Sequence, residues 1–300
     1  MTENIWLWMK YFFFFPIFSL LPSPCPYLLA RYLSFIDYRC NPLQGDFIKK
    51  QILKYLSHLE FSPKELDLIA RRYFEVIFCD EIDLFIYFFR FPKNFIKRIK
   101  IEGKGNWEEA LSGGKGIFLS AHFGGGFWIL PFLKEKGIGT HFFSADIRKE
   151  DYPSKKALYF YHRLRNWVVE RASGDKVIFK QEGKKDLIEI LEKGGRVIVL
   201  FDVPPFLIKE NMEVSFLGKK AVFPKGIISI AKETNSPILP FFSFLDEGKH
   251  RRICFEKPLH VIDEEECVKR CVVLIESKII ERPDHWHFWP IADQFFVNNR

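Results

Sequence analysis

Short apolar runs alternate with amphipathic stretches along the chain from residue 96 onward. The apolar runs lie at 96–101, 116–121, 138–144, 176–179, 196–201, 237–245 and 251–255. Stretches with helical spacing of apolar residues fall between them, at 106–112, 126–136, 155–165, 184–193, 225–234 and 264–280. Strands and helices that alternate at these lengths predict an α/β fold with helices on both faces of a sheet.

Two longer amphipathic stretches, 43–60 and 63–91, precede this pattern and predict helices. Ser62 offers an N-cap for the second helix, with Pro63 at its first position and Glu65 nearby. Further along, two turns share one form, Leu-Ser-Gly-Gly-Lys-Gly at 111–116 and Leu-Glu-Lys-Gly-Gly-Arg at 191–196. Each closes a helix with glycine and leads into an apolar strand.

The N-terminal segment 5–21 is almost wholly apolar. We expect no cleaved signal peptide, because the start lacks a basic region and no small-residue cleavage site follows. At about 17 residues the segment is at the lower limit for a membrane span. It is therefore a short span, an interfacial helix with Trp6, Trp8 and Tyr11 at headgroup depth, or a buried core helix. We favour membrane attachment, and a second apolar helix at 27–36 then packs on the domain or the bilayer.

The chain shows no internal repeat and no low-complexity linker. The simplest division is an N-terminal membrane-anchoring segment, 1–40, followed by a catalytic domain, 41–300. That domain comprises a helical preface, 41–95, and an α/β core, 96–300.

Composition adds two constraints. The net charge of +7 suits an anionic partner such as a phospholipid headgroup, a nucleic acid or a phosphorylated substrate. Basic residues are scattered among acidic ones, so we expect no nucleic-acid partner. The 34 Phe residues reflect either compositional bias or apolar surface that meets lipid. The six cysteines form no metal-binding or disulfide pattern, and Cys267 and Cys271 are expected to be buried thiols in a reducing compartment.

Polar residues of chemical interest follow two of the apolar runs. The run at 116–121 delivers His122 into the glycine-rich turn Gly124-Gly125-Gly126. The run at 196–201 ends at Asp202. Because ligands of such sheets gather at the carboxyl ends of the strands, Asp202 either faces the same cleft as His122 or serves as a turn or N-cap residue.

Other kinds of chemistry have little support in the sequence. There is no Gly-x-Ser-x-Gly motif, and Ser120 lacks the context of a hydrolase nucleophile. No phosphate-binding loop or dinucleotide motif is present. His285 and His287 could form a pair of metal ligands, but an aromatic cap together with Trp286 and Trp289 is the better interpretation. We therefore expect no metal and no cofactor.

Six blocks of sequence occur in the order found in one family. The chain resembles the bacterial lipid A biosynthesis acyltransferases, the lauroyl/myristoyl branch of the lysophospholipid acyltransferase superfamily. The blocks are the N-terminal apolar helix with its Ser-Leu-Leu-Pro turn, GNWEEAL leading into GKGIFLSAHFGG, HRLRN, GGRVIVLFD, SFLGKKA, and RPDHWHFW near the C-terminus.

The resemblance implies an αβα sandwich with a mixed, mostly parallel sheet behind a membrane-associated helix. It also implies transfer of a fatty acyl chain from acyl carrier protein or acyl-CoA to a hydroxyl of a membrane glycolipid such as a lipid A precursor. The expected location is the cytoplasmic face of the bacterial inner membrane. The acyl thioester is a co-substrate, and the oligomeric state is left open.

The same resemblance assigns roles to individual residues. His122 occupies the position of the general base that takes the proton of the acceptor hydroxyl. Arg163 and Arg165 fall where the family carries basic residues near the acceptor, and Lys219 could contact a headgroup. Backbone N–H groups of Gly124, Gly125 and Gly126 either face the oxyanion or merely allow the following aromatic residues to turn inward.

One departure bears directly on catalysis. The family carries an acid five residues after the histidine, where this chain has Phe127. Either Asp202, or less plausibly Asp146, supplies the carboxylate, or a carbonyl group or water orients the ring. The third alternative is a non-catalytic, lipid-binding accessory protein of the membrane.

Overall fold

The centre of the molecule is a mixed sheet of mostly parallel strands. The computed structural model describes residues 3–90, 93–180, 183–207, 210–246 and 251–297. In this part of the chain seven strands pair in the order β1-β9-β8-β2-β5-β3-β4. Only β9 runs antiparallel to its neighbour β8, and the remaining pairs are parallel. The bounds are β1 (Lys100–Glu102), β2 (Gly116–Ser120), β3 (Thr140–Ser144), β4 (Gly174–Phe179), β5 (Arg196–Leu200), β8 (Ile238–Leu245) and β9 (Arg251–Phe255).

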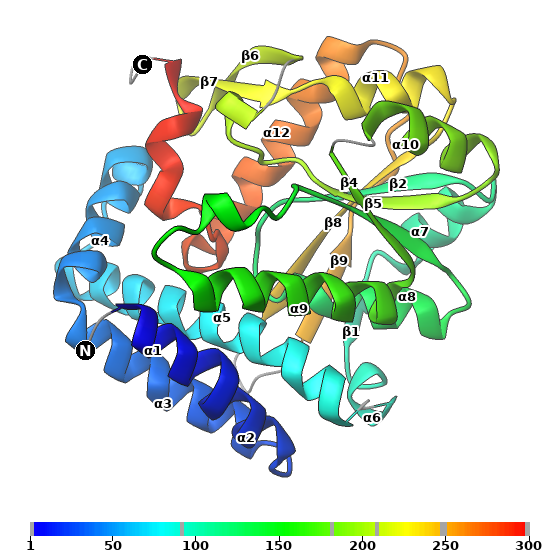
Figure 1. Ribbon diagram of the computed structural model, residues 1–300. Helices are drawn as coiled ribbons and strands as arrows, with labels where there is room; N and C mark the ends of the chain where they lie inside the picture. Colours follow the sequence, from blue (N-terminus) through cyan, green and yellow to red (C-terminus); the bar gives the residue numbers. More distant parts are fainter. Residues whose placement is uncertain (1–2, 91–92, 181–182, 208–209, 247–250, 298–300) are drawn as a thin grey trace.

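Helices cover both faces of this sheet, which confirms the predicted αβα architecture (Figure 1). The helices α8 (Ile129–Glu135) and α9 (Lys156–Ser173) lie on one face. The other face carries α10 (Gly183–Glu192), α11 (Gly226–Glu233) and α12 (Glu264–Glu281). The remaining helices are α1 (Glu3–Met9), η1 (Lys10–Phe14), α2 (Phe15–Leu20), α3 (Cys25–Cys40), α4 (Pro42–Leu56), α5 (Pro63–Arg90), α6 (Lys93–Ile96) and α7 (Lys104–Leu111).

The predicted start of the long helix α5 is confirmed. The Ser62 backbone N–H donates to Glu65 Oε2 at 2.8 Å, and the Glu65 N–H donates back to Ser62 Oγ at 3.3 Å. This reciprocal pair satisfies N–H groups that a helix start leaves without partners. The two glycine turns are confirmed as well, since Gly114 and Gly194 both adopt the left-handed conformation, with φ of 82° and 83°.

Three details differ from the sequence-based expectations. Only the last two residues of the strand predicted at 96–101 belong to a strand, β1, since Ile96 ends α6 and a turn follows it. The helix predicted at 155–165 continues to Ser173, because apolar positions such as Val168 and Ala172 keep its buried face continuous. The pattern also missed a separate hairpin of β6 (Asn211–Phe216) and β7 (Lys219–Pro224), whose exposed lysines interrupt the alternation of apolar residues.

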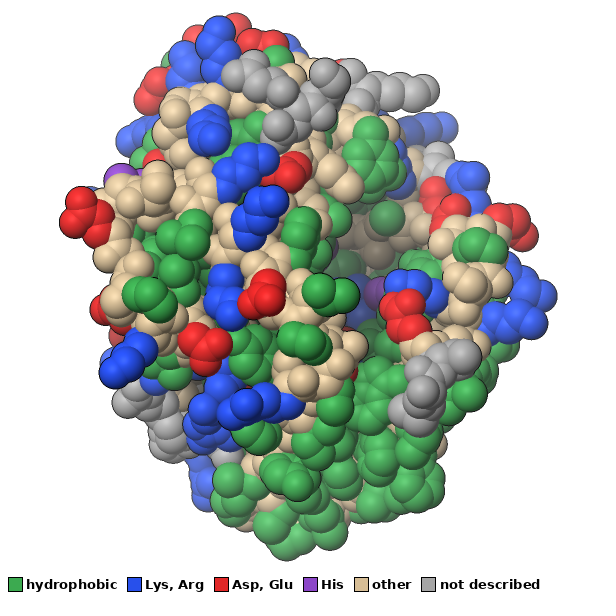
Figure 2. Space-filling model, turned by 90° about the vertical axis from the view of Figure 1, so that its left-hand side faces the viewer, with side chains coloured by type: hydrophobic (Ala, Val, Ile, Leu, Met, Phe, Trp, Pro, Cys, Tyr) green, Lys and Arg blue, Asp and Glu red, His purple; other side chains and the backbone are tan. Residues whose placement is uncertain are grey.

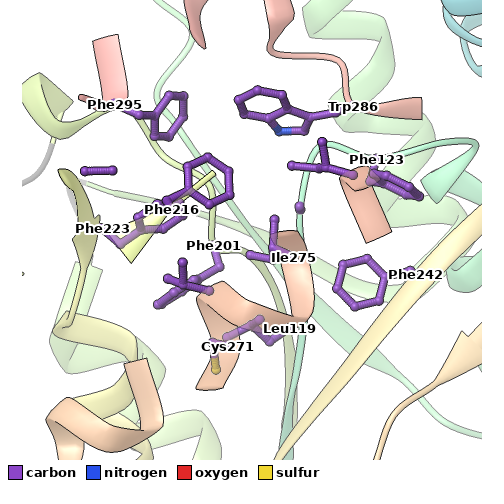
Figure 3. Close-up of a cluster of buried hydrophobic side chains, with 14 of the residues drawn as sticks. Leu119, Phe123, Phe201, Phe216, Phe223, Phe242, Cys271, Ile275, Trp286 and Phe295 are labelled. Atoms are coloured by element: carbon purple, nitrogen blue, oxygen red, sulfur yellow. The ribbon is translucent and has the colours of Figure 1, made fainter. Parts of the chain in front are cut away.

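Alternating residues of the central strands enter two different hydrophobic clusters. Leu119 of β2 belongs to the cluster on the side of α12 and the β6–β7 hairpin. Phe118 belongs to the cluster on the side of α8 and α9. Figure 3 shows the first cluster, in which Phe216 and Phe223 of the hairpin approach Trp286 and Phe295 from the C-terminal segment. This packing fixes the C-terminal segment against the ends of the central strands.

The N-terminal helices pack on α5 along one side and expose apolar side chains on the other. Phe15 is fully buried against Phe78, and the Tyr11 hydroxyl donates to Glu81 at 2.6 Å. Phe13 and Leu20, by contrast, are 54% and 60% exposed. None of the helices in the described ranges is both long and apolar enough to cross a bilayer.

Candidate active site

The register of two neighbouring strands brings His122 and Asp202 together. Parallel strands β2 and β5 pair residue for residue from Gly116 opposite Arg196 to Ser120 opposite Leu200. His122 and Asp202 each follow two residues beyond the last of these pairs. The Phe201 N–H donates to the Ser120 carbonyl at 2.7 Å and extends the pairing past the end of the strands. The two side chains therefore meet at the carboxyl edge of the sheet, where open α/β sheets bind ligands.

The Asp202 carboxylate binds both the ring and the backbone of His122. His122 Nδ1 lies 2.8 Å from Asp202 Oδ1. The His122 backbone N–H donates to both carboxylate oxygens, at 2.9 and 3.0 Å, and Trp286 Nε1 donates to Oδ2 at 2.9 Å. With Nδ1–H donating to the carboxylate, Nε2 of His122 is the nitrogen that can accept a proton.

The ring of His122 is partly exposed, whereas Asp202 is sealed. The exposed fraction is 32% for the His122 side chain and 0% for that of Asp202. Phe288 stacks on the imidazole, with ring centroids 4.0 Å apart, and the His287 N–H donates to the His122 carbonyl at 2.9 Å. The C-terminal segment thus holds the histidine in place while one part of the ring stays open to a pocket.

The structure separates the alternatives for the missing acid at position 127. Asp202 reaches His122, whereas Asp146 lies beside Arg148, with an N–O distance of 3.8 Å. Phe127 packs edge-on against Tyr87, with centroids 5.4 Å apart. The position that holds an acid in related sequences is therefore part of an aromatic wall.

A pocket with mainly apolar walls begins at the His122 ring and extends between the sheet, α5, α8 and α9. It encloses about 680 Å³ of empty space, open solvent at its mouth included. On the face shown in Figure 2, histidine and Lys/Arg side chains are visible within a hollow of the surface. The apolar lining of the pocket consists of Leu84, Ala121, Phe123, Phe127, Ile129, Leu130, Phe142, Val169, Ile198, Leu200 and Phe241.

The basic residues named from the sequence fall at different places. Arg165 lines the pocket together with His122, and its guanidinium lies 5.8 Å from the Phe142 ring. Arg165 forms no ion pair within the described ranges, so its charge is available to an anion. Arg163 is exposed on α9 and does not line the pocket. Lys219 begins β7 and lies over the Tyr55 ring, at 5.1 Å, away from this pocket.

The three glycines after His122 have distinct surroundings. Gly124 adopts a φ of 58°, and a Cβ there would lie 1.9 Å from the Ser243 carbonyl oxygen, so no other residue fits. Its N–H donates to the His285 carbonyl at 2.8 Å and is not free for an oxyanion. A Cβ at Gly125 would lie 2.5 Å from Arg251 Nη1. Gly126 begins the short helix η3 (Gly126–Trp128) and lines the pocket.

Two further ionisable groups line the pocket. Burial, together with repulsion from His122 and other nearby cations, lowers the pKa of His287 to about 3, so this imidazole is neutral at neutral pH. Burial and the neighbouring Asp83 raise the pKa of Asp80 to about 7, although Arg251 and Arg165 oppose the rise. Asp80 could not be identified from the sequence, because nothing in the sequence of α5 distinguishes it from the nearby acidic residues Glu81 and Asp83.

His285 and His287 do not converge on a common ligand position. His285 is fully buried, and its Nε2 accepts the Leu245 N–H at 3.0 Å. Across the described ranges, no cluster of three or more His, Cys, Asp or Glu residues has the geometry of a metal site. Trp286, which lies between the two histidines, and Trp289, two residues after His287, are fully buried, as an aromatic cap requires.

Comparison with known proteins identifies the family of this chain. The chain belongs to the bacterial lipid A biosynthesis acyltransferase family, whose sequence model matches residues 62–290. The chain is accordingly an acyltransferase, and its family acts in lipid biosynthesis. No curated protein matches it. Among solved structures, the 1-acyl-sn-glycerophosphate acyltransferase PlsC from Thermotoga maritima is similar, with 15% identity and a TM-score of 0.36. That match covers 85% of this chain and 96% of the PlsC chain.

Proposed function

We propose that this protein transfers a fatty acyl chain from an acyl thioester, carried by acyl carrier protein or CoA, to a hydroxyl of a membrane glycolipid such as a lipid A precursor. The observation that carries the proposal is the 2.8 Å contact between His122 and a sealed carboxylate at the mouth of an apolar pocket. This contact compensates for the absence of an acid at position 127, because the imidazole of His122 still has a carboxylate partner.

His122 acts as general base in this reaction. Its Nε2 takes the proton of the acceptor hydroxyl while the hydroxyl oxygen attacks the thioester carbonyl carbon. The new carbon–oxygen bond gives a tetrahedral oxyanion, whose collapse breaks the carbon–sulfur bond. The leaving thiolate then takes the proton from the imidazolium. Asp202 holds the tautomer and balances the positive charge that the ring acquires.

The pocket provides the other parts of the site. Arg165 supplies a cation for the oxyanion or for a substrate phosphate, because its guanidinium lines the pocket without a carboxylate partner in the described ranges. The apolar lining suits a hydrocarbon chain, which gains roughly 0.8 kcal/mol for each methylene that it buries. A donor chain in this pocket would present its thioester near His122.

The exposed apolar surface of the N-terminal helices and α9 supports the proposal that the protein attaches to a membrane. Trp8 of α1 contacts Phe160 of α9, with centroids 5.8 Å apart, so the two surfaces are continuous. Figure 2 shows hydrophobic side chains gathered over the lower part of this face. On α9, Phe160 and Trp167 point outward while Tyr161 and Arg165 line the pocket. A lipid substrate at the cytoplasmic face of the inner membrane would thus lie close to the catalytic pocket.

The test is acyl transfer by purified protein in mixed micelles, with acyl-CoA or acyl carrier protein as donor and a lipid A precursor as acceptor. His122→Ala should abolish transfer above background. Asp202→Asn should lower turnover by about 10²–10⁴-fold, because an amide cannot balance the imidazolium charge. The melting temperature of each variant checks that the fold is intact.

A matched control is His58→Ala, which removes an exposed imidazole far along the chain from the site and should leave transfer unchanged. Transfer that survives His122→Ala would overturn the proposal. If the unchanged protein binds lipid but transfers no acyl group from either donor, the accessory interpretation is favoured instead.

A further inference from the structure

One carboxyl oxygen of Asp80 has no hydrogen-bond partner among the described residues, and it lies in the pocket that holds His122. Asp80 lies on α5 one turn before Leu84, and both residues line the pocket. Its Oδ1 atom is buried and makes no hydrogen bond within the described ranges. By contrast, the neighbouring acid Asp83, which is fully buried, is bound by Tyr27 and Arg251. The described part of the fold therefore leaves one buried oxygen of the partly exposed Asp80 unsatisfied.

The unsatisfied carboxyl oxygen of Asp80 destabilises the protein when no ligand is bound, because its surroundings are apolar. The pocket walls around it are mostly apolar, with Phe127 and Tyr161 among them. Burial and repulsion from Asp83 raise the pKa of Asp80 to about 7, so protonated and ionised forms coexist near neutral pH. A buried carboxyl in either form needs a hydrogen-bond partner. The position of Asp80 in the pocket indicates that a polar group of the ligand supplies this hydrogen bond.

The shape of the site limits which part of a substrate can reach Asp80. In the function proposed above, the acceptor hydroxyl reaches Nε2 of His122, whose side chain is 32% exposed, and a sugar headgroup is too broad to follow it deeper along the apolar walls. An acyl chain is slim enough to pass along the apolar walls. Among polar groups that such a chain can carry, a hydroxyl both donates and accepts, so it satisfies Asp80 in either protonation state.

We propose that the pocket binds a hydroxylated acyl chain of the donor and that Asp80 holds its hydroxyl group. The proposal rests on the function proposed above and narrows the donor to hydroxyacyl thioesters. Hydrogen bonding to a substrate hydroxyl discriminates strongly, because a donor without that group leaves the buried carboxyl unpaired.

The experiment compares kcat/KM for a saturated acyl-CoA and for its 2-hydroxy and 3-hydroxy analogues of equal chain length. The wild-type protein should prefer one hydroxy analogue by about tenfold. Asp80→Leu, which keeps a branched side chain but removes the hydrogen bond, should abolish this preference, so that kcat/KM for the hydroxy donor falls to the value for the plain donor. Asp80→Asn, which still donates and accepts, should retain part of the preference.

Two results would overturn the proposal. One is equal use of all three donors by the wild-type protein. The other is an equal loss for plain and hydroxy donors in Asp80→Leu, which would mean that Asp80 positions Arg165 instead. A second measurement needs no turnover: the rise in melting temperature caused by the free hydroxy fatty acid, compared with the plain fatty acid, should be larger in the wild type and equal in Asp80→Leu. If no donor is transferred but this difference persists, the proposed function fails while the hydroxyl site stands.

Discussion

In the proposed mechanism, Asp202 supplies from a neighbouring strand the carboxylate that the family resemblance led us to expect at position 127. Three N–H contacts, two from the His122 backbone amide and one from Trp286, hold its two oxygens. A carboxylate fixed in this way cannot turn away from Nδ1 during the reaction, which is the condition for orienting an imidazole. Position 127 is thereby free to be aromatic and to form part of the pocket wall.

The raised pKa of Asp80 predicts a measurable effect of pH on the stability of the protein. The pKa rises from its ordinary 3.8 to about 7 because of burial and of Asp83. The folded protein therefore binds more protons than the unfolded chain between these values. Stability from this group is fully present below about pH 4 and is lost as the pH rises through 7.

We therefore expect Asp80→Asn to gain stability relative to the wild type as the pH rises. The difference in free energy of unfolding between the variant and the wild type should be about 2 kcal/mol larger at pH 8 than at pH 5. Urea denaturation at both pH values measures this change. A difference that does not vary with pH would show that the carboxyl of Asp80 is solvated in the free protein.

Sequence reasoning reached some residues of the site and not others. His122 and Asp202 could be found because each follows an apolar strand that a glycine turn starts, and equal strand lengths place them side by side. The bond from Trp286 to Asp202 joins residues 84 positions apart and depends on tertiary packing. The unpartnered state of Asp80 is also invisible in sequence, because it depends on what α5 meets. The roles of Arg163 and Lys219 stay predictions, although neither lines the pocket.

Among the secondary-structure elements, the alternating strands and helices of the core could be predicted from the sequence, whereas the β6–β7 hairpin could not. The buried strands β2 and β5 appear as short apolar runs, since both faces of a parallel strand are covered. The β6–β7 hairpin was missed because only Val214 and Phe216 of β6 are buried and because β7 begins with two exposed lysines. Its antiparallel pairing becomes evident only when Phe216 and Phe223 pack beneath the C-terminal segment.

A buried ion pair joins the helix α5 to the strand β9. Arg251 is 2% exposed, and its guanidinium binds Asp83 and the Cys79 carbonyl of α5. It also lies directly behind Gly125, in the turn that follows His122. The pair therefore links the helical preface, the sheet edge and the catalytic turn.

Breaking this pair from one side should be far worse than removing it entirely. Arg251→Met should destabilise the fold by about 3–5 kcal/mol, because Asp83 is left charged and buried. Adding Asp83→Leu should recover most of this loss, since two apolar side chains can replace a buried pair. The midpoints of urea denaturation curves measure both effects, provided that the dependence of the free energy of unfolding on urea concentration is the same in all variants.

The exposed pair of Asp46 and Lys49, at 2.8 Å, is the matched control for this measurement. The double change Asp46→Leu with Lys49→Met should alter stability by less than about 1 kcal/mol. If Arg251→Met with Asp83→Leu is as unstable as Arg251→Met alone, the guanidinium supports the catalytic turn through contacts other than the ion pair.

At the scale of the whole molecule, apolar surface and catalytic pocket lie on opposite sides of α9. The exposed apolar residues of segment 5–21, the last turn of α5 and α9 include Ile5, Trp8, Phe12, Phe13, Ile17, Leu20, Leu21, Phe88, Phe89, Phe160 and Trp167. The abundance of Phe thus contributes to a surface as well as to the core, an outcome that composition alone left open. A surface of this extent is typical of a site of interaction with lipid or protein.

If the protein attaches to membranes as proposed, this surface predicts which side chains make the contact. Phe13→Asp combined with Leu20→Asp should lower the partition of the protein onto anionic phospholipid vesicles by about 100-fold, because each side chain loses roughly 1.5–3 kcal/mol of burial in the bilayer. Co-sedimentation with vesicles measures the partition. Ile262→Asp is the matched control, since Ile262 is 88% exposed but lies in the loop before α12, outside the apolar surface. Equal loss of binding in the control, or no loss in the double variant, would place the membrane contact elsewhere and would separate the pocket from its supply of lipid.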